Sequence, residues 1–192
     1  MATTPPPSVS ALVEAQRPRR KDAARNYDAL IQAARELFAE RGAEAPLEDV
    51  AKQAGVGIGT LYRNFPTRRE LFESVYAAEV DALCRWAGEV ADREPWEALS
   101  AWLHRFVGYA ATKRALREAM DSESAVFLTC RISMFEAGRP LLERAQRAGV
   151  VRADLELDDL LRLVAGITAT SFTDDAQRDR VLEIALDGIR PR

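Results

Sequence analysis

The chain has 192 residues, with 27 Lys and Arg against 30 Asp and Glu and a single histidine. The net charge of −3 excludes a wholly basic nucleic-acid coat, and the length is ample for one large or two small compact units. The two cysteines lie far apart in apolar patterns, so we expect no disulfide framework and a reducing cytoplasm. The sequence also predicts neither a signal peptide nor a membrane-spanning run.

The first part of the chain is predicted to be a flexible basic leader, residues 1–21. Residues 1–16 are rich in Pro, Ser and Thr at their start, which indicates a mobile tail. Positive charges then gather at Arg17, Arg19, Arg20, Lys21 and Arg25. Two interpretations stay open for this cluster: a solvated leader, or an arm that contacts phosphates or a minor groove.

Three short helices are predicted next. The first ends at Gly42 and carries an apolar stripe of Tyr27, Leu30, Ile31, Ala34, Leu37 and Phe38. The second begins at Pro46, has Leu47, Val50, Ala51 and Ala54 on one face, and ends at Gly55. The third is anchored by Leu61 and Phe65 and is stopped by Pro66. Thr67 and Glu70 then predict a capping box at the start of a longer helix.

The third helix is predicted to point mostly polar residues away from the core. A single helix has the width that fits a DNA major groove. Its sequence context is A-G-V-G-I-G-T-L-Y-R-N-F-P-T-R-R-E-L-F, which resembles the recognition-helix signature of the TetR/AcrR family of transcriptional regulators. The resemblance runs from roughly Tyr27 to Val75, and beyond Val75 it is one of helical layout. It implies an all-α fold of about nine helices. A helix-turn-helix DNA-binding domain over 22–67 would precede a helical effector-binding and dimerisation domain over 68–192.

The predicted DNA-binding residues are Arg25, Gly57, Ile58, Gly59, Thr60, Tyr62, Arg63, Asn64 and Arg68. The fork of Arg63 matches the O6 and N7 atoms of guanine, and a phosphate clamp is the alternative. Tyr62 either reaches a phosphate or packs against the first helix. Asn64 and Arg68 resemble phosphate contacts of the family. Ala45 and Glu48 depart from the family pattern, so the contribution of the second helix to DNA contact stays open.

The rest of the chain predicts further amphipathic helices. Their expected ranges are 68–90, 95–111, 112–120, 124–148, 158–171 and 174–188. Gly138 and Pro140 predict a kink or break in the fourth of these, because proline removes a backbone donor and clashes with the preceding turn.

The resemblance implies a ligand chamber among the helices from Val80 to Ala148. Its candidate wall residues are Trp102, His104, Phe106, Tyr109, Phe127, Cys130, Arg131 and Met134. Plain core packing is the alternative for the aromatic stripe, and the polar edge of a helix is the alternative for His104. The last two helices predict a dimer interface of Leu161, Val164, Ala165, Thr168, Val181, Leu182, Ala185 and Ile189. The alternative is that they close only their own core.

No catalytic motif, cofactor site or metal site is predicted. The sequence predicts a cytoplasmic homodimeric repressor that binds a near-palindromic double-stranded DNA operator and is released by a small-molecule effector, with no membrane association. Two alternatives remain. One is a helical small-molecule-binding or enzymatic protein whose N-terminal motif is scaffold, and the other is an activator of the same architecture.

Overall fold

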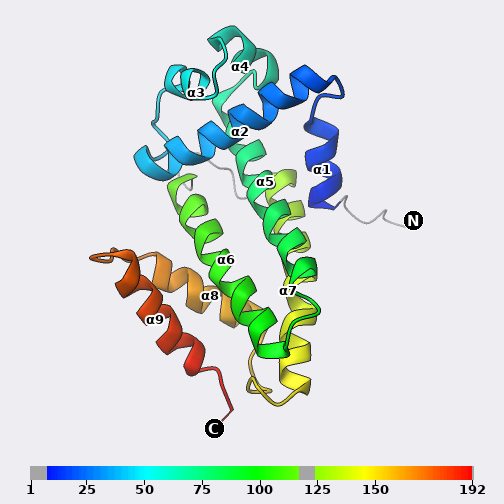
Figure 1. The fold of residues 1–192 in the computed structure, drawn as a ribbon, viewed down its shortest axis with the longest axis vertical. Helices are drawn as coiled ribbons and strands as arrows, with labels where there is room; N and C mark the ends of the chain where they lie inside the picture. Colours follow the sequence, from blue (N-terminus) through cyan, green and yellow to red (C-terminus); the bar gives the residue numbers. More distant parts are fainter. Residues whose placement is uncertain (1–7, 117–123, 192) are drawn as a thin grey trace. The chain divides into compact units, whose positions relative to one another are not determined.

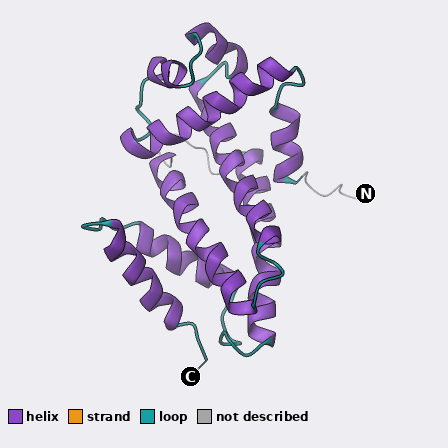
Figure 2. Ribbon diagram, viewed as in Figure 1, coloured by secondary structure: helices purple, strands orange, loops and turns teal. Residues whose placement is uncertain are grey.

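The computed structural model describes residues 8–116 and 124–191, and within these ranges all regular structure is helical (Figures 1 and 2). The helices of the described ranges are α1 (Val9–Gln16), α2 (Lys21–Arg41), α3 (Leu47–Gln53), α4 (Ile58–Asn64), α5 (Arg68–Glu89), α6 (Pro95–Leu116), α7 (Ala125–Arg147), α8 (Leu157–Thr168) and α9 (Asp175–Asp187). The all-α prediction is confirmed. None of the described helices combines the length and hydropathy that a bilayer crossing requires.

The chain divides into two compact units. The first comprises residues 1–81 and 112–133, and the second comprises residues 82–111 and 134–192. This division follows the packing of the chain. The functional boundaries predicted after residues 21 and 67 remain predictions.

The first unit contains the core that positions α3 and α4. Tyr27 of α2 lies 5.1 Å from Phe65, ring centroid to ring centroid, and Phe38 meets Phe72 of α5 edge to face at 4.7 Å. Leu30 of α2 is fully buried in the same core. Aromatic pairs in such tilted geometries add to the hydrophobic term, so the apolar stripe of α2 holds the following short helices.

The start of the first unit differs from the sequence prediction. Residues 9–16 form α1, whose N-cap Ser8 accepts a hydrogen bond from the backbone N–H of Ala11, and Val9 is only 1% exposed. The mobile tail is therefore a wrong prediction over residues 8–16, while residues 1–7 lie outside the described residues. Prolines dominate the composition of the first residues, so composition alone did not identify Ser8, which follows them, as a helix N-cap.

The second unit is built around Trp102 of α6, which is fully buried. Its indole N–H donates to the carbonyl oxygen of Leu83 at 3.3 Å, and its ring lies so close to Gly138 of α7 that a Cβ there would stand 2.3 Å from it. The helix α7 continues through Pro140. Of the two outcomes predicted near Gly138, the break is therefore wrong, and the kink remains a prediction. Leu141, the residue after the proline, is buried, so the turn that follows Pro140 packs in the core.

Two other predicted boundaries also change. Residues 112–116 continue α6 where a separate helix was expected, and the remainder of that expected helix, residues 117–120, lies outside the described residues. The predicted helices near the C-terminus are present as α8 and α9, each within a few residues of its predicted bounds.

Candidate DNA-binding interface

The turn between α3 and α4 has the geometry that the glycine pattern predicts. Gly55 has a φ of +71°, its N–H donates to the carbonyl of Lys52 at 3.1 Å, and the N–H of Val56 donates to the carbonyl of Ala51 at 3.0 Å. These two bonds close the last turn of α3 and reverse the chain, as in a Schellman motif. The turn therefore sets the direction in which α4 leaves.

The helix α4 has one buried and one exposed face. Leu61 is fully buried, and Phe65, the residue that follows the helix, is 2% exposed. On the other face, Ile58 is 37% exposed and Tyr62 is 46% exposed, and Arg63 is also exposed. An exposed helix face with both polar and apolar groups is what a major groove accepts.

The predicted DNA-binding residues of α4 lie together on and beside this face. Gly57 and Gly59 are exposed, while Thr60 and Asn64 are half-buried. The Arg63 Nε donates to the carbonyl of Gly59 at 3.1 Å and its Nη2 donates to Thr60 Oγ1 at 3.3 Å, while Asn64 Nδ2 donates to the carbonyl of Thr60 at 2.8 Å. The donors of Arg63 and Asn64 thus bond to groups of their own helix.

A groove joins α4 to the start of α2. It has a volume of about 360 Å³, and its lining residues are Arg20, Asp22, Ala23, Asn26, Thr60, Arg63 and Asn64. Two arginines and three residues with hydroxyl or amide groups line it against one carboxylate, that of Asp22, so its lining favours phosphate overall. Sequence reasoning missed Asn26 and did not single out Arg20 from the basic run that contains it. Arg25 is exposed 3.9 Å from Asp22 and does not line the groove.

Arg68 has a supporting role within the first unit. Its Nη1 donates to the carbonyl oxygens of Ala43 and Ala45 at 2.7 and 2.9 Å, and its guanidinium lies over the Phe72 ring at 6.0 Å. It therefore ties the α2–α3 loop to α5, and its predicted phosphate contact remains a prediction. The capping box beside it is confirmed, because Thr67 N–H donates to Glu70 Oε2 and Glu70 N–H donates to Thr67 Oγ1.

The candidate chamber residues fall into the two units. Trp102, Phe106, Tyr109 and Met134 belong to the second unit and are buried there, with the Phe106 and Tyr109 ring centroids 5.1 Å apart. Phe127, Cys130 and Arg131 belong to the first unit, where Phe127 stacks on Tyr76 at 5.4 Å. The chamber remains a prediction.

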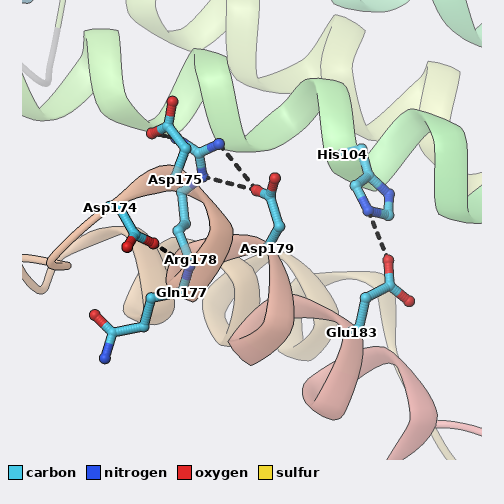
Figure 3. A network of polar contacts seen from close by, with 7 residues as sticks. All are labelled: His104, Asp174, Asp175, Gln177, Arg178, Asp179 and Glu183. Atoms are coloured by element: carbon cyan, nitrogen blue, oxygen red, sulfur yellow. Dashed lines mark hydrogen bonds and ion pairs between the residues drawn. The ribbon is translucent and has the colours of Figure 1, made fainter.

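His104 lies on the exposed side of α6. Its Nε2 is 2.9 Å from Glu183 Oε1 of α9 (Figure 3). Its Nδ1 is 2.8 Å from the carbonyl oxygen of Ser100. On the opposite side of the same view, Asp174 caps α9 by accepting from the N–H of Gln177 at 2.7 Å. His104 is thus paired with a neighbouring helix of its own unit.

Most of the predicted dimer residues are buried within their own unit. Leu161, Val164, Thr168, Leu182 and Ile189 are at most 8% exposed, and Ala165, Val181 and Ala185 are half-buried. By contrast, Leu163 is 41% exposed and Ile184 is 71% exposed. These two side chains, which the sequence reasoning did not single out, are accessible on the outer faces of α8 and α9.

A short helix presented by a glycine turn on a three-helix core makes the first unit a helix-turn-helix DNA-binding module. The family model for bacterial regulatory proteins of the tetR family matches residues 30–75, and the model for the SbtR-like transcriptional regulator C-terminal domain matches residues 94–191. The chain belongs to the TetR family of transcriptional regulators.

Relatives of known structure agree with this assignment. A TetR transcriptional regulator from Streptomyces coelicolor is 42% identical, with 85% of this chain and 98% of that chain covered and a TM-score of 0.73. A TetR transcription regulatory protein from Mycobacterium vanbaalenii is 32% identical, with 91% and 100% covered and a TM-score of 0.72. An HTH-type transcriptional regulator of Staphylococcus aureus is 27% identical over 106 residues. That match spans 57% of the length of the curated relative and 54% of this chain.

Proposed function

We propose that the protein is a ligand-responsive repressor that binds a palindromic operator as a homodimer and is released by a small-molecule effector. The observation that carries the proposal is the outward face of α4, which continues into a groove lined by Arg20 and Arg63. The helix has the width of a major groove, and the groove beside it offers the donors that phosphates need.

The residues of this face divide into two roles. Arg63 reads a guanine through its O6 and N7 atoms, which is worth about 1–3 kcal/mol of discrimination. Arg20, Thr60 and Asn64 contact phosphates and set the register of α4 on the duplex. To reach the bases, Arg63 exchanges its hydrogen bonds to Gly59 and Thr60 for bonds to DNA.

A second copy of the chain binds through α8 and α9. Leu163 and Ile184 are large apolar side chains open to solvent on the two helices, and a twofold dimer would pair them with the same residues of the partner. Two recognition helices about 34–36 Å apart would then read half-sites one helical turn apart, which is why we expect a palindromic operator.

Release follows from linkage between the two ligands. An effector that prefers a conformation with a different spacing of the two α4 helices lowers DNA affinity, and operator DNA lowers effector affinity by the same factor. A coupling of about 1–3 kcal/mol is ordinary for such systems. The chamber predicted between Val80 and Ala148 is the proposed site for this effector.

DNA binding is tested by fluorescence anisotropy with the DNA just upstream of the protein's own gene and a scrambled duplex of equal length. We expect tighter binding to the upstream DNA and a steep fall in affinity between about 50 and 200 mM salt. Equal affinity for both duplexes, or no salt dependence, would reject the proposal. In vitro transcription from the same promoter distinguishes a repressor from an activator, since a repressor lowers the amount of transcript and an activator raises it.

A further inference from the structure

The helix α1 is attached to the first unit largely through polar groups. Among the residues that the structure describes, the buried polar or charged ones are Ser74, Asp81, Thr129, Ser133 and Thr168. Three of these contact α1: Ser133 Oγ accepts from the N–H of Val9 at 3.0 Å, Asp81 accepts from the hydroxyl of Ser10, and Ser74 Oγ lies 3.3 Å from Gln16 Oε1. Three of these five buried polar side chains therefore take part in the attachment of α1.

The apolar part of this attachment is small. Val9 is the one α1 residue that is buried, and Leu12 and Val13 are half-buried. When α1 leaves, water can satisfy Ser74, Asp81 and Ser133, so detachment costs less than uncovering an apolar face of the same size. By contrast, α2 buries seven apolar residues against the core, including Leu30 and Phe38. Within the first unit, α1 is thus attached in a way that permits release while α2 stays in place.

The two ends of α1 contact different helices. Its first residue bonds to Ser133 of α7, three residues after Cys130, while Arg17 at its C-cap holds Asp28 of α2 through two bonds of 2.8 and 2.5 Å. Pro18, Arg19 and Arg20 then lead into α2, and Arg20 lines the groove beside Arg63. The helix α1, dark blue in Figure 1, therefore connects Ser133 of α7 with the residues that lead to Arg20.

We propose that α1 is a detachable clasp that couples α7 to DNA binding. In the docked state, it fixes the turn of residues 17–20 so that Arg20 meets a phosphate beside the major groove that α4 occupies. A shift of α7 at Ser133 removes the acceptor of Val9 and releases α1. The turn of residues 17–19 then no longer restrains the side chain of Arg20, which is the N-cap of α2, and DNA affinity falls. This inference rests on the proposed function, because Arg20 needs a DNA phosphate as its target.

The test uses the full-length protein with Ser10→Ala and Ser133→Ala combined, which removes two of the polar contacts. Glu14→Gln, on the exposed side of α1, is the matched control. We expect faster hydrogen exchange over residues 9–16 and about 5- to 10-fold weaker binding to the upstream DNA, within the usual range of coupling between sites. The slope of log affinity against log salt should fall by about 0.9, the contribution of one phosphate contact. The control should match the wild type in all three measurements.

A second variant keeps the test decisive if the first leaves α1 docked. Val9→Asp places a carboxylate where the side chain is buried, so it undocks α1, and circular dichroism verifies that the rest of the chain stays folded. Unchanged DNA affinity and salt slope in an undocked variant would overturn the clasp. That result differs from failure of the proposed function, in which the wild-type protein itself would bind upstream and scrambled DNA equally.

Discussion

The helix pairs α3–α4 and α8–α9 share a plan but differ in what they expose. Each pair buries an inner apolar stripe and leaves a second face to solvent. On α4 that face combines Tyr62 with Arg63, whereas α8 and α9 expose Leu163 and Ile184. Protein–DNA interfaces are more polar and more basic than interfaces between proteins, whose buried centres are depleted in charge. The difference therefore supports the proposal that DNA is the partner of the first pair and that a second copy of the chain is the partner of the other.

Replacing Ile184 with aspartate is expected to have the largest effect. Its side chain is 71% exposed in the single chain and would be buried between two copies, where an unpaired carboxylate costs several kcal/mol. The dimer dissociation constant should therefore rise by about 100-fold or more, as sedimentation equilibrium would measure. Ile132→Asp, at another exposed isoleucine, controls for the added charge and should leave the dimer intact. If Ile184→Asp dimerised as tightly as the wild type, a second copy of the chain would not bind through this part of α8 and α9.

The polar face is tested by comparing Arg63→Ala with Arg25→Ala. Loss of Arg63 should reduce the preference for the matched operator over a scrambled duplex by about 1–3 kcal/mol, because its guanine contact disappears. Arg25 is an exposed cation of the basic segment that does not line the groove, so its loss should remove only a general attraction to phosphates and weaken binding to both duplexes about equally. Competition gel shifts measure both ratios. If Arg63→Ala weakened the two duplexes equally, Arg63 would be a phosphate clamp and α4 would read sequence through other residues.

The turn that presents α4 is tested by Gly55→Ala. Gly55 has a φ of +71° with open space around its Cβ position, so the cost is one of backbone conformation, about 1–2 kcal/mol of unfolding free energy. Gly57→Ala is the matched control, since Gly57 also has open space but an ordinary φ of −74°. Urea unfolding should show destabilisation in Gly55→Ala alone. Equal stability of the two variants would mean that the turn does not depend on the left-handed conformation.

Local signals account for what the sequence predicted well. Apolar spacing, the glycine at position 55 and the Thr67–Glu70 pair each act within a few residues, so the helices around α4 and their capping box were predictable. Long-range packing accounts for the rest. The docking of α1 depends on Ser133, which is 124 residues from Val9 in the sequence. No sequence pattern near either residue predicts this contact.

The candidate sites show the same division. The outward residues of α4 follow from helical periodicity, but the groove also needs Arg20 and Asn26 from the start of α2, which only the folded chain brings close. In α8 and α9, periodicity identified apolar stripes without indicating which apolar residues face inward. Ile184 was therefore missed, although Leu182 and Ile189 were named.

The smallest expected effect concerns Tyr27, which lies behind α4 while Tyr62 lies on its outer face. Burial raises the pKa of the Tyr27 phenol, and its hydrogen bond with Ser74 acts in the opposite direction. Below pH of about 10, the phenol is protonated in both states and its contribution to stability is complete. Above that pH the unfolded chain loses the proton first, so the unfolding free energy falls by at most about 1.4 kcal/mol per pH unit. Tyr27→Phe should abolish this fall, and urea unfolding at pH 8, 10 and 11 measures it. If the unfolding free energy of the variant fell with pH as in the wild type, another residue would cause the fall.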